Sequence, residues 1–139
     1  MSHAIALIDI LSDEPALMAF VQDRFRIGAE AGVFESHVGG PNGNESCVYA
    51  VTGRAYLGFA TFHRPYDEQA FIWIGYLWVE PAHRGRGIAR QLVRTVEQTL
   101  SDGGRVAFGT LAPNSSMLQV AEKLGYGRHA ITLQREVPA

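Results

Sequence analysis

The spacing of apolar residues alternates along the chain between the two-residue period of strands and the 3.6-residue period of helices. In the first half of the chain, this pattern predicts a strand, two helices, a loop and a pair of strands joined by a tight turn. These are a strand at residues 4–10, a helix with apolar residues from Leu17 to Phe25, a short helix within 27–36, a loop at 39–44, and strands at 47–52 and 55–63. Pro15 suits the first turn of the first helix, which Ser12 or Asp13 is expected to cap.

A run that is apolar on both faces, residues 70–79, is the main feature of the second half. Such a run is typical of a central strand covered on each side by helices, and Gly75 in its middle is a candidate bulge. The remaining elements are a helix with an apolar stripe from Ile88 to Leu100 that Gly103 ends, a strand at 105–111, a helix capped by Asn114 or Ser115 that Gly125 ends, and a strand at 127–137. We therefore expect one α/β domain over residues 1–139, with a mixed (α+β) central sheet and helices on both of its faces.

Composition and charge exclude several classes of function. Twelve Lys and Arg against fourteen Asp and Glu give a net charge of −2, so no basic field covers the whole surface to hold nucleic acid. The single cysteine, Cys47, excludes an internal disulfide, and the five histidines show no metal-ligand spacing. No apolar stretch has the length of a membrane span, and the N-terminus lacks the basic region of a signal peptide. We expect a cytoplasmic protein that binds no metal, nucleic acid or membrane.

The segment with a chemical signature is residues 77–89, where a buried strand, a short loop with two glycines and a helix start follow one another. Backbone amides of such a loop can turn toward one point, and the helix start adds unsatisfied amides and the positive end of its dipole. This combination binds phosphate, and Arg84 and Arg86 add positive charge. A Walker loop would need Gly-Lys-Ser/Thr, and a dinucleotide fingerprint would need a third glycine where Arg90 stands. Binding of ATP or NAD is therefore disfavoured.

The run Val79-x-Pro81-x-x-Arg84-Gly85-x-Gly87-Ile88-Ala89 resembles the pyrophosphate-binding signature of the GNAT superfamily of acyl-CoA N-acyltransferases. That signature, Gln/Arg-x-x-Gly-x-Gly/Ala, stands here as Arg84-x-x-Gly87-x-Ala89. A second segment resembles the family's Asn…Tyr-Glu-Lys-x-Gly-Phe/Tyr helix; it reads Asn114-x-x-Met117-x-x-Val120-Ala121-Glu122-Lys123-Leu124-Gly125-Tyr126. The two motifs stand in the family's order, each on its expected element, whereas the first fifty residues carry no diagnostic motif.

The resemblance implies an acyl-CoA N-acyltransferase that binds acetyl-CoA, or another short acyl-CoA, as co-substrate between two splayed central strands. It assigns to the acyl-CoA site Leu77, Val79, Arg84, Gly85, Arg86, Gly87, Ile88, Ala89 and Asn114. The Val79 amide would then polarise the thioester carbonyl, and Trp73 would shape the acceptor site. The implied acceptor is a small-molecule or peptide amine. Edge strands of such a sheet can pair between subunits, which leaves a homodimer open.

The sequence departs from the family at its acid–base positions. The family's carboxylate base corresponds to Trp73 or Gly109, and its tyrosine acid corresponds to Ala121, so the catalytic residues stay unassigned. A non-catalytic acyl-CoA-binding or regulatory module of the same fold is the alternative that this departure favours. Glu80 is expected to be exposed rather than a base, and Arg24 is expected to be solvated or to attract an acidic substrate group.

Overall fold

The computed structural model of the chain describes residues 4–34, 40–53, 55–64, 70–109, 115–127, 135 and 137–138. Within them lie five strands, three α-helices and two short 3-10 helices. Their bounds are β1 Ile5–Ile10, η1 Leu11–Asp13, α1 Pro15–Glu30, β2 Ser46–Thr52, β3 Ala55–His63, β4 Phe71–Val79, η3 Pro81–His83, α2 Ile88–Gln98, β5 Arg105–Phe108 and α3 Ser115–Lys123. No helix in the described ranges combines the length and the apolarity that crossing a membrane requires.

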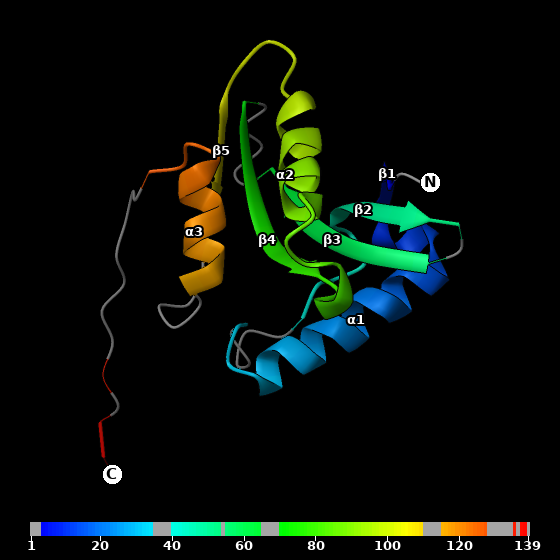
Figure 1. Cartoon of the computed structure of the whole chain (residues 1–139), viewed down its shortest axis with the longest axis vertical. Helices are drawn as coiled ribbons and strands as arrows, with labels where there is room; N and C mark the ends of the chain where they lie inside the picture. The colour runs from blue at the N-terminus through cyan, green and yellow to red at the C-terminus, as the bar shows by residue number, and fades with distance from the viewer. Residues whose placement is uncertain are drawn as a thin grey trace.

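The strands form one sheet in the order β1-β2-β3-β4-β5. The pairs from β1 to β4 are antiparallel, and β5 adds to β4 in parallel. Helix α2 connects these two parallel strands, as a crossover connection requires. In Figure 1, α1 and α2 lie against opposite faces of the sheet and α3 lies beside β5. The expected mixed sheet with helices on both faces is therefore confirmed.

Two cores cover the two faces of the sheet. The apolar stripe of α2 packs on one face, where the helix contributes Ile88, Leu92, Val93 and Val96. The other face packs against α1 through Leu17 and Val21, next to buried side chains of β2, β3 and β4. Because β4 supplies side chains to both cores, the apolar run that the sequence places at 70–79 is explained by burial on each side.

The bulge expected at Gly75 is confirmed by the register of β3 and β4. Thr61 pairs with Tyr76 and Phe62 pairs with Ile74, so Gly75 is the extra residue of β4. One additional residue exchanges the faces of every later side chain. Ile74 and Leu77 therefore both face α2, although three positions separate them.

Three expectations about helix ends are wrong. Neither Ser12 nor Asp13 caps α1, because residues 11–13 form η1. The Leu11 amide of η1 donates a hydrogen bond to the Glu45 carbonyl at 3.1 Å, which fixes this segment. No second helix begins at residue 27, since α1 itself continues to Glu30. Helix α2 ends at Gln98, before Gly103. At this end the Thr99 hydroxyl donates a hydrogen bond to the Val96 carbonyl at 2.7 Å.

In the second half, the strand expected at 105–111 is shorter than expected, because β5 ends at Phe108, where its pairing with β4 stops. The helix end expected at Gly125 is confirmed. Helix α3 ends at Lys123, and Gly125 adopts the left-handed conformation. The Tyr126 amide then donates a hydrogen bond to the Ala121 carbonyl at 2.9 Å. The cap at Asn114 and the turn residue Arg54 lie outside the described residues, as does most of the strand expected at 127–137.

Candidate acyl-CoA site

The central feature of the site is a split between β4 and β5. The two strands pair only from Phe71 to Ile74 on β4 and from Arg105 to Phe108 on β5, after which β4 continues alone to Val79. A narrow cavity of about 30 Å³ lies where the pairing ends. We call it the neck; its lining is Val33, Phe34, Ile74, Gly75, Tyr76, Leu77, Phe108, Gly109 and Met117. The bulge at Gly75 therefore coincides with the point where the strands separate.

Backbone groups of β4 beyond the bulge face this split. The Glu80 amide donates to Leu57 of β3 at 2.8 Å, and the Tyr76 amide donates to the Thr61 hydroxyl of β3 at 3.1 Å. Successive amides of a strand point to opposite sides. The Leu77 and Val79 amides therefore point away from β3, toward the side where β5 has left the sheet.

A groove of about 610 Å³ adjoins the neck along β4, the start of α2 and one face of α3. Seven of the nine residues assigned to the acyl-CoA site line it, namely Leu77, Val79, Arg84, Gly85, Gly87, Ile88 and Ala89. Arg86 is not among the lining residues, and its guanidinium lies 3.4 Å from Nδ1 of His83. Asn114 lies outside the described residues.

The start of α2 opens into this groove. Gly87 occupies the N-cap position with φ of 81°, in the left-handed region, and no side chain caps the helix among the residues described. A Cβ built at Gly87 would meet no atom within 4 Å, so the space in front of the first helical amides is open. Ile88 is 7% exposed because its side chain anchors the helix in the core. This end therefore offers backbone amides and a positive dipole to an anion.

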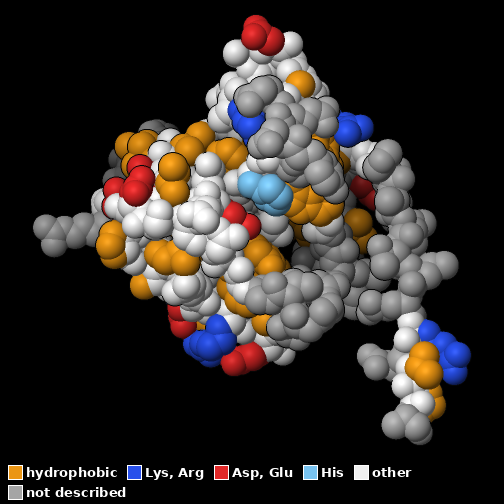
Figure 2. Space-filling model, turned by 180° about the vertical axis from the view of Figure 1, so that it is seen from behind, with side chains coloured by type: hydrophobic (Ala, Val, Ile, Leu, Met, Phe, Trp, Pro, Cys, Tyr) orange, Lys and Arg blue, Asp and Glu red, His pale blue; other side chains and the backbone are white. Residues whose placement is uncertain are grey.

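Basic side chains from three places reach the same groove. Arg84 lies before the helix, Arg90 in its first turn and Lys123 at the end of α3. Arg84 is fixed by its Nε on the Val79 carbonyl at 2.8 Å and by its guanidinium over the Trp78 ring. Arg90 and Lys123 are additions to the sequence-based site. Arg90 lies in the first turn of the helix whose start is expected to bind phosphate, and Lys123 stands in the second motif. On the face in Figure 2, Lys and Arg side chains are scattered and form no continuous field.

The positions that lack acid and base are filled by packing. A Cβ at Gly109 would lie 3.6 Å from Cζ2 of Trp73, so the indole covers the second of the two expected carboxylate positions. Trp73 remains 38% exposed and lies on the face of β4 opposite Ile74. It can therefore shape a surface next to the neck, but it offers no proton acceptor. Ala121 does not line the groove.

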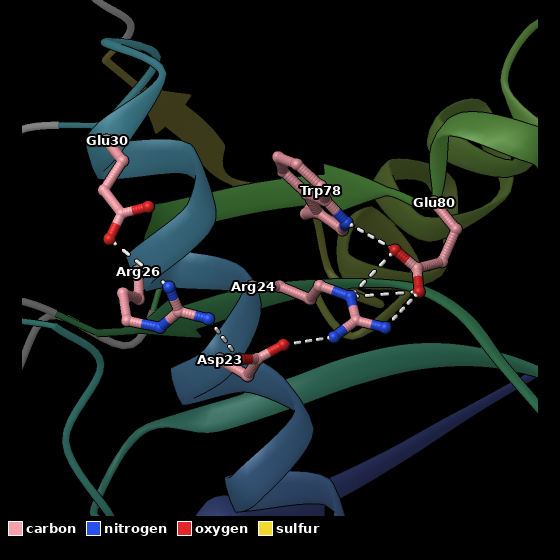
Figure 3. Close-up of polar contacts among 6 residues, drawn as sticks. All are labelled: Asp23, Arg24, Arg26, Glu30, Trp78 and Glu80. Atoms are coloured by element: carbon pink, nitrogen blue, oxygen red, sulfur yellow. Dashed lines mark hydrogen bonds and ion pairs between the residues drawn. The ribbon is translucent and has the colours of Figure 1, made fainter.

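Glu80, which follows β4, is held in a network with α1 (Figure 3). Its carboxylate accepts from Nε of Arg24 at 2.9 Å and from the Trp78 indole at 2.9 Å. Asp23 also contacts the Arg24 guanidinium. The hydrogen bond from Arg24 is the main reason why the pKa of Glu80 lies below its ordinary value. Glu80 is a structural carboxylate, and Arg24 is paired rather than solvated.

The described residues contain no group of three or more His, Cys, Asp and Glu side chains placed to hold a metal ion.

The hydroxyl of Tyr126, an aromatic residue of the second motif, donates a hydrogen bond to Glu97 of α2 at 2.8 Å. Burial and Glu97 together raise the pKa of Tyr126, so this phenol is poorly suited to release a proton.

Comparisons with known proteins agree with this geometry. The model of the GNAT acetyltransferase family matches residues 8–126, whereas no curated protein matches the chain. An aminoglycoside acetyltransferase from an uncultured soil metagenomic sample superposes with a TM-score of 0.68 at 19% identity, covering 99% of both chains. The aminoglycoside N-acetyltransferase AAC(6')-Iy, in complex with CoA, superposes with a TM-score of 0.65 at 18% identity, covering 98% of this chain and 96% of the other. A transcriptional regulator from Bacillus halodurans C-125 superposes with a TM-score of 0.64 at 18% identity, covering 97% of this chain and 100% of the other. At these identities the likeness concerns the fold.

Proposed function

The chain belongs to the GNAT acetyltransferase family, and we propose that it transfers the acetyl group of acetyl-CoA to an amine in a ternary complex. The observation that carries this proposal is the continuous path from the open start of α2 along β4 to the neck. A helix start suits a pyrophosphate, a strand whose amides point toward the split suits an extended arm, and a narrow neck suits a small acyl group.

In this proposal the pyrophosphate would bind the amides of residues 87–89, with Arg84, Arg90 and Lys123 around it. The fit rests on three features of the groove: the left-handed Gly87, the open space beside it and the absence of a capping side chain among the described residues. Each would be explained by an anion that takes the place of a cap. Another short acyl-CoA would fit the same contacts.

The geometry favours the Leu77 amide, rather than the Val79 amide expected from the sequence, as the donor to the thioester carbonyl. Both amides point toward the split, but only Leu77 lines the neck as well as the groove. A fixed donor aimed at the developing oxyanion contributes about 3 kcal/mol in comparable acyl-transfer sites.

The acceptor would approach the neck beside Gly75 and Trp73. Several of the similar structures are aminoglycoside acetyltransferases; one was solved with sisomicin and another with a bisubstrate analogue that carries acetylneamine. Polyamine sugars are therefore the first acceptors to test, with peptide amines next. The exposed indole of Trp73 offers an apolar surface on which a sugar ring can stack.

Steady-state acetyl transfer tests the proposal. Purified protein, acetyl-CoA and one amine at a time are followed by release of the CoA thiol, with mass spectrometry of the amine as the second readout. We expect CoA release that depends on the amine and an acetylated product. Acetyl-CoA binding without turnover on any aminoglycoside, polyamine or peptide would contradict the proposed activity.

A non-catalytic acyl-CoA-binding or regulatory module is the second candidate. The observation that favours it is that Trp73, Gly109 and Ala121 stand where the family's base and acid are expected. A transcriptional regulator among the similar structures points the same way. The two candidates differ in turnover and share the binding of acyl-CoA.

A further inference from the structure

A buried carboxylate, Glu45, lies beside the bulge of β4. It precedes β2, and its Oε2 is buried without a hydrogen-bond partner among the described residues. Oε1 lies 3.9 Å from the position that a Cβ at Gly75 would occupy. Since Gly75 also lines the neck, a single glycine borders both the carboxylate and the proposed position of the acyl group.

Thr61 joins this carboxylate to the bulge. Its hydroxyl accepts the Tyr76 amide at 3.1 Å and hydrogen bonds the Glu45 carboxylate. The hydroxyl accepts from the Tyr76 amide with a lone pair and has one proton to donate to the carboxylate. The same group therefore fixes the bulge and orients Glu45. The Cβ position at Gly75 is 3.1 Å from this oxygen, which leaves no room for a side chain between β4 and Glu45.

The surroundings of Glu45 also suit a proton acceptor. Burial is the main reason why its pKa lies above the ordinary value, while the Asn42 amide and the Thr61 hydroxyl act in the opposite direction. A raised pKa brings a carboxylate closer to the pH at which a general base is most effective. From β2, the Cys47 thiol faces this region; burial, with Glu45 and with Asp9 of β1, raises its pKa to about 12, so it stays protonated.

Resting on the proposed acetyl transfer, we propose that Glu45 is the general base that deprotonates the acceptor ammonium beside Gly75. Because Trp73 on β4 and Gly109 after β5 occupy the expected base positions, the carboxylate would be supplied instead by the residue that precedes β2. The neck, at about 30 Å³, has room for a water molecule that can carry the proton to it.

The proposed step moves one proton before the acyl group moves. An N–H bond of the ammonium breaks and the proton passes to the Glu45 carboxylate, which leaves the amine with a free electron pair. That pair forms the new C–N bond at the thioester carbon while the C–S bond breaks. The CoA thiolate leaves with the sulfur electron pair, and it takes up the second proton, which the newly acylated nitrogen releases to give the neutral amide. Neither oxidant nor reductant is involved.

The test uses two amines of nearly equal size that differ in basicity. Ethylamine is protonated at pH 7, as a lysine-type amine with pKa about 10.4 is, whereas methoxyamine is neutral. Rates of acetyl transfer are measured for wild type and for Glu45→Gln at pH 7. We expect Glu45→Gln to lower kcat/KM for ethylamine by about 100-fold or more, and for methoxyamine by less than about tenfold. Glu30→Gln, an exposed carboxylate on α1, is the matched control and should change neither rate.

An equal loss on both amines, or no loss, would overturn the role of Glu45 and leave the acetyl transfer intact. A wild-type protein that acetylates neither these amines nor any in the acceptor screen would overturn the transfer and the base together. An acetyl-CoA-induced rise in Tm equal to that of wild type verifies that Glu45→Gln is folded. If it does not fold, Glu45→Asp decides: a larger loss on ethylamine than on methoxyamine supports the base, and equal losses overturn it.

Discussion

Glu45 and Glu80 lie at the two ends of the part of β4 that β5 leaves unpaired, and their surroundings shift their pKa values in opposite directions. Arg24 lowers the pKa of Glu80, while burial raises that of Glu45. A carboxylate held by a guanidinium serves structure, since it keeps its charge and its partners at neutral pH. A carboxylate kept partly out of water, with one oxygen unpartnered, is better suited to take up a proton.

The Arg24–Glu80 pair is expected to stabilise the fold by linking α1 to the end of β4. The side chains are 26% and 19% exposed, so the pair lies between the surface and buried cases. A double-mutant cycle with Arg24→Met and Glu80→Gln, measured by urea unfolding at pH 7, should give a coupling energy of about 1–2 kcal/mol. Arg26→Met is the control, because that guanidinium is 59% exposed, and it should leave the free energy of unfolding nearly unchanged. A coupling no larger than the control's effect would contradict this role.

The same pair gives stability a defined pH dependence. Because the folded pKa of Glu80 is lower than its value of 4.5 in a model compound, its contribution is fully present above that pH. It is lost as the pH falls through the folded pKa. Arg24→Met removes the main cause of the lowered pKa. Its free energy of unfolding should therefore fall less than that of wild type as the pH is lowered below 4.5, as measured by urea unfolding at each pH.

At the scale of elements, long periodic segments could be predicted from the sequence, whereas several ends of helices and strands could not. The bounds of β3 and β4 were predictable because their apolar runs are buried. The end of β5 was not, since this strand is only partly buried and stops at Phe108, short of the expected residue 111. The first turn of α1 at Pro15 was predictable, but its cap was not, because the Leu11 and Ser12 amides of η1 donate to the carbonyls of the distant residues Glu45 and Gly43. The bulge was predictable because Gly75 interrupts a bulky strand.

The loop before α2 carries the most specific prediction at this scale. Gly87→Ala should weaken acetyl-CoA binding about tenfold or more, because a Cβ enters the space before the helical amides and disfavours φ of 81°. Gly103→Ala is a matched control, since Gly103 also has positive φ and also has no atom within 4 Å of its Cβ position. Isothermal titration should find weaker binding for Gly87→Ala alone. Equal affinities for the two variants would contradict the role of the loop.

At the scale of the whole molecule, the sheet joins groups that the sequence keeps far apart. Pairing of Cys47 with Thr61 and of Thr61 with Tyr76 brings the residue before β2 to the bulge of β4. The loop before α2, which is proposed to bind the pyrophosphate, could be located from the sequence because its residues are consecutive. Glu45 could not, since a lone glutamate between asparagine and serine gives no local signal and depends on strand order and register.

Thermal unfolding with acetyl-CoA, CoA, ATP and NAD, each in parallel, tests the central claim that this groove binds acyl-CoA. A ligand at 100 times its Kd stabilises the folded state by about 2.7 kcal/mol, which raises Tm by on the order of 10 °C in a chain of this size. We predict such a rise with acetyl-CoA and CoA, and none with NAD or ATP at the same concentration. A rise with ATP or NAD alone, or with none of the four, would contradict the account.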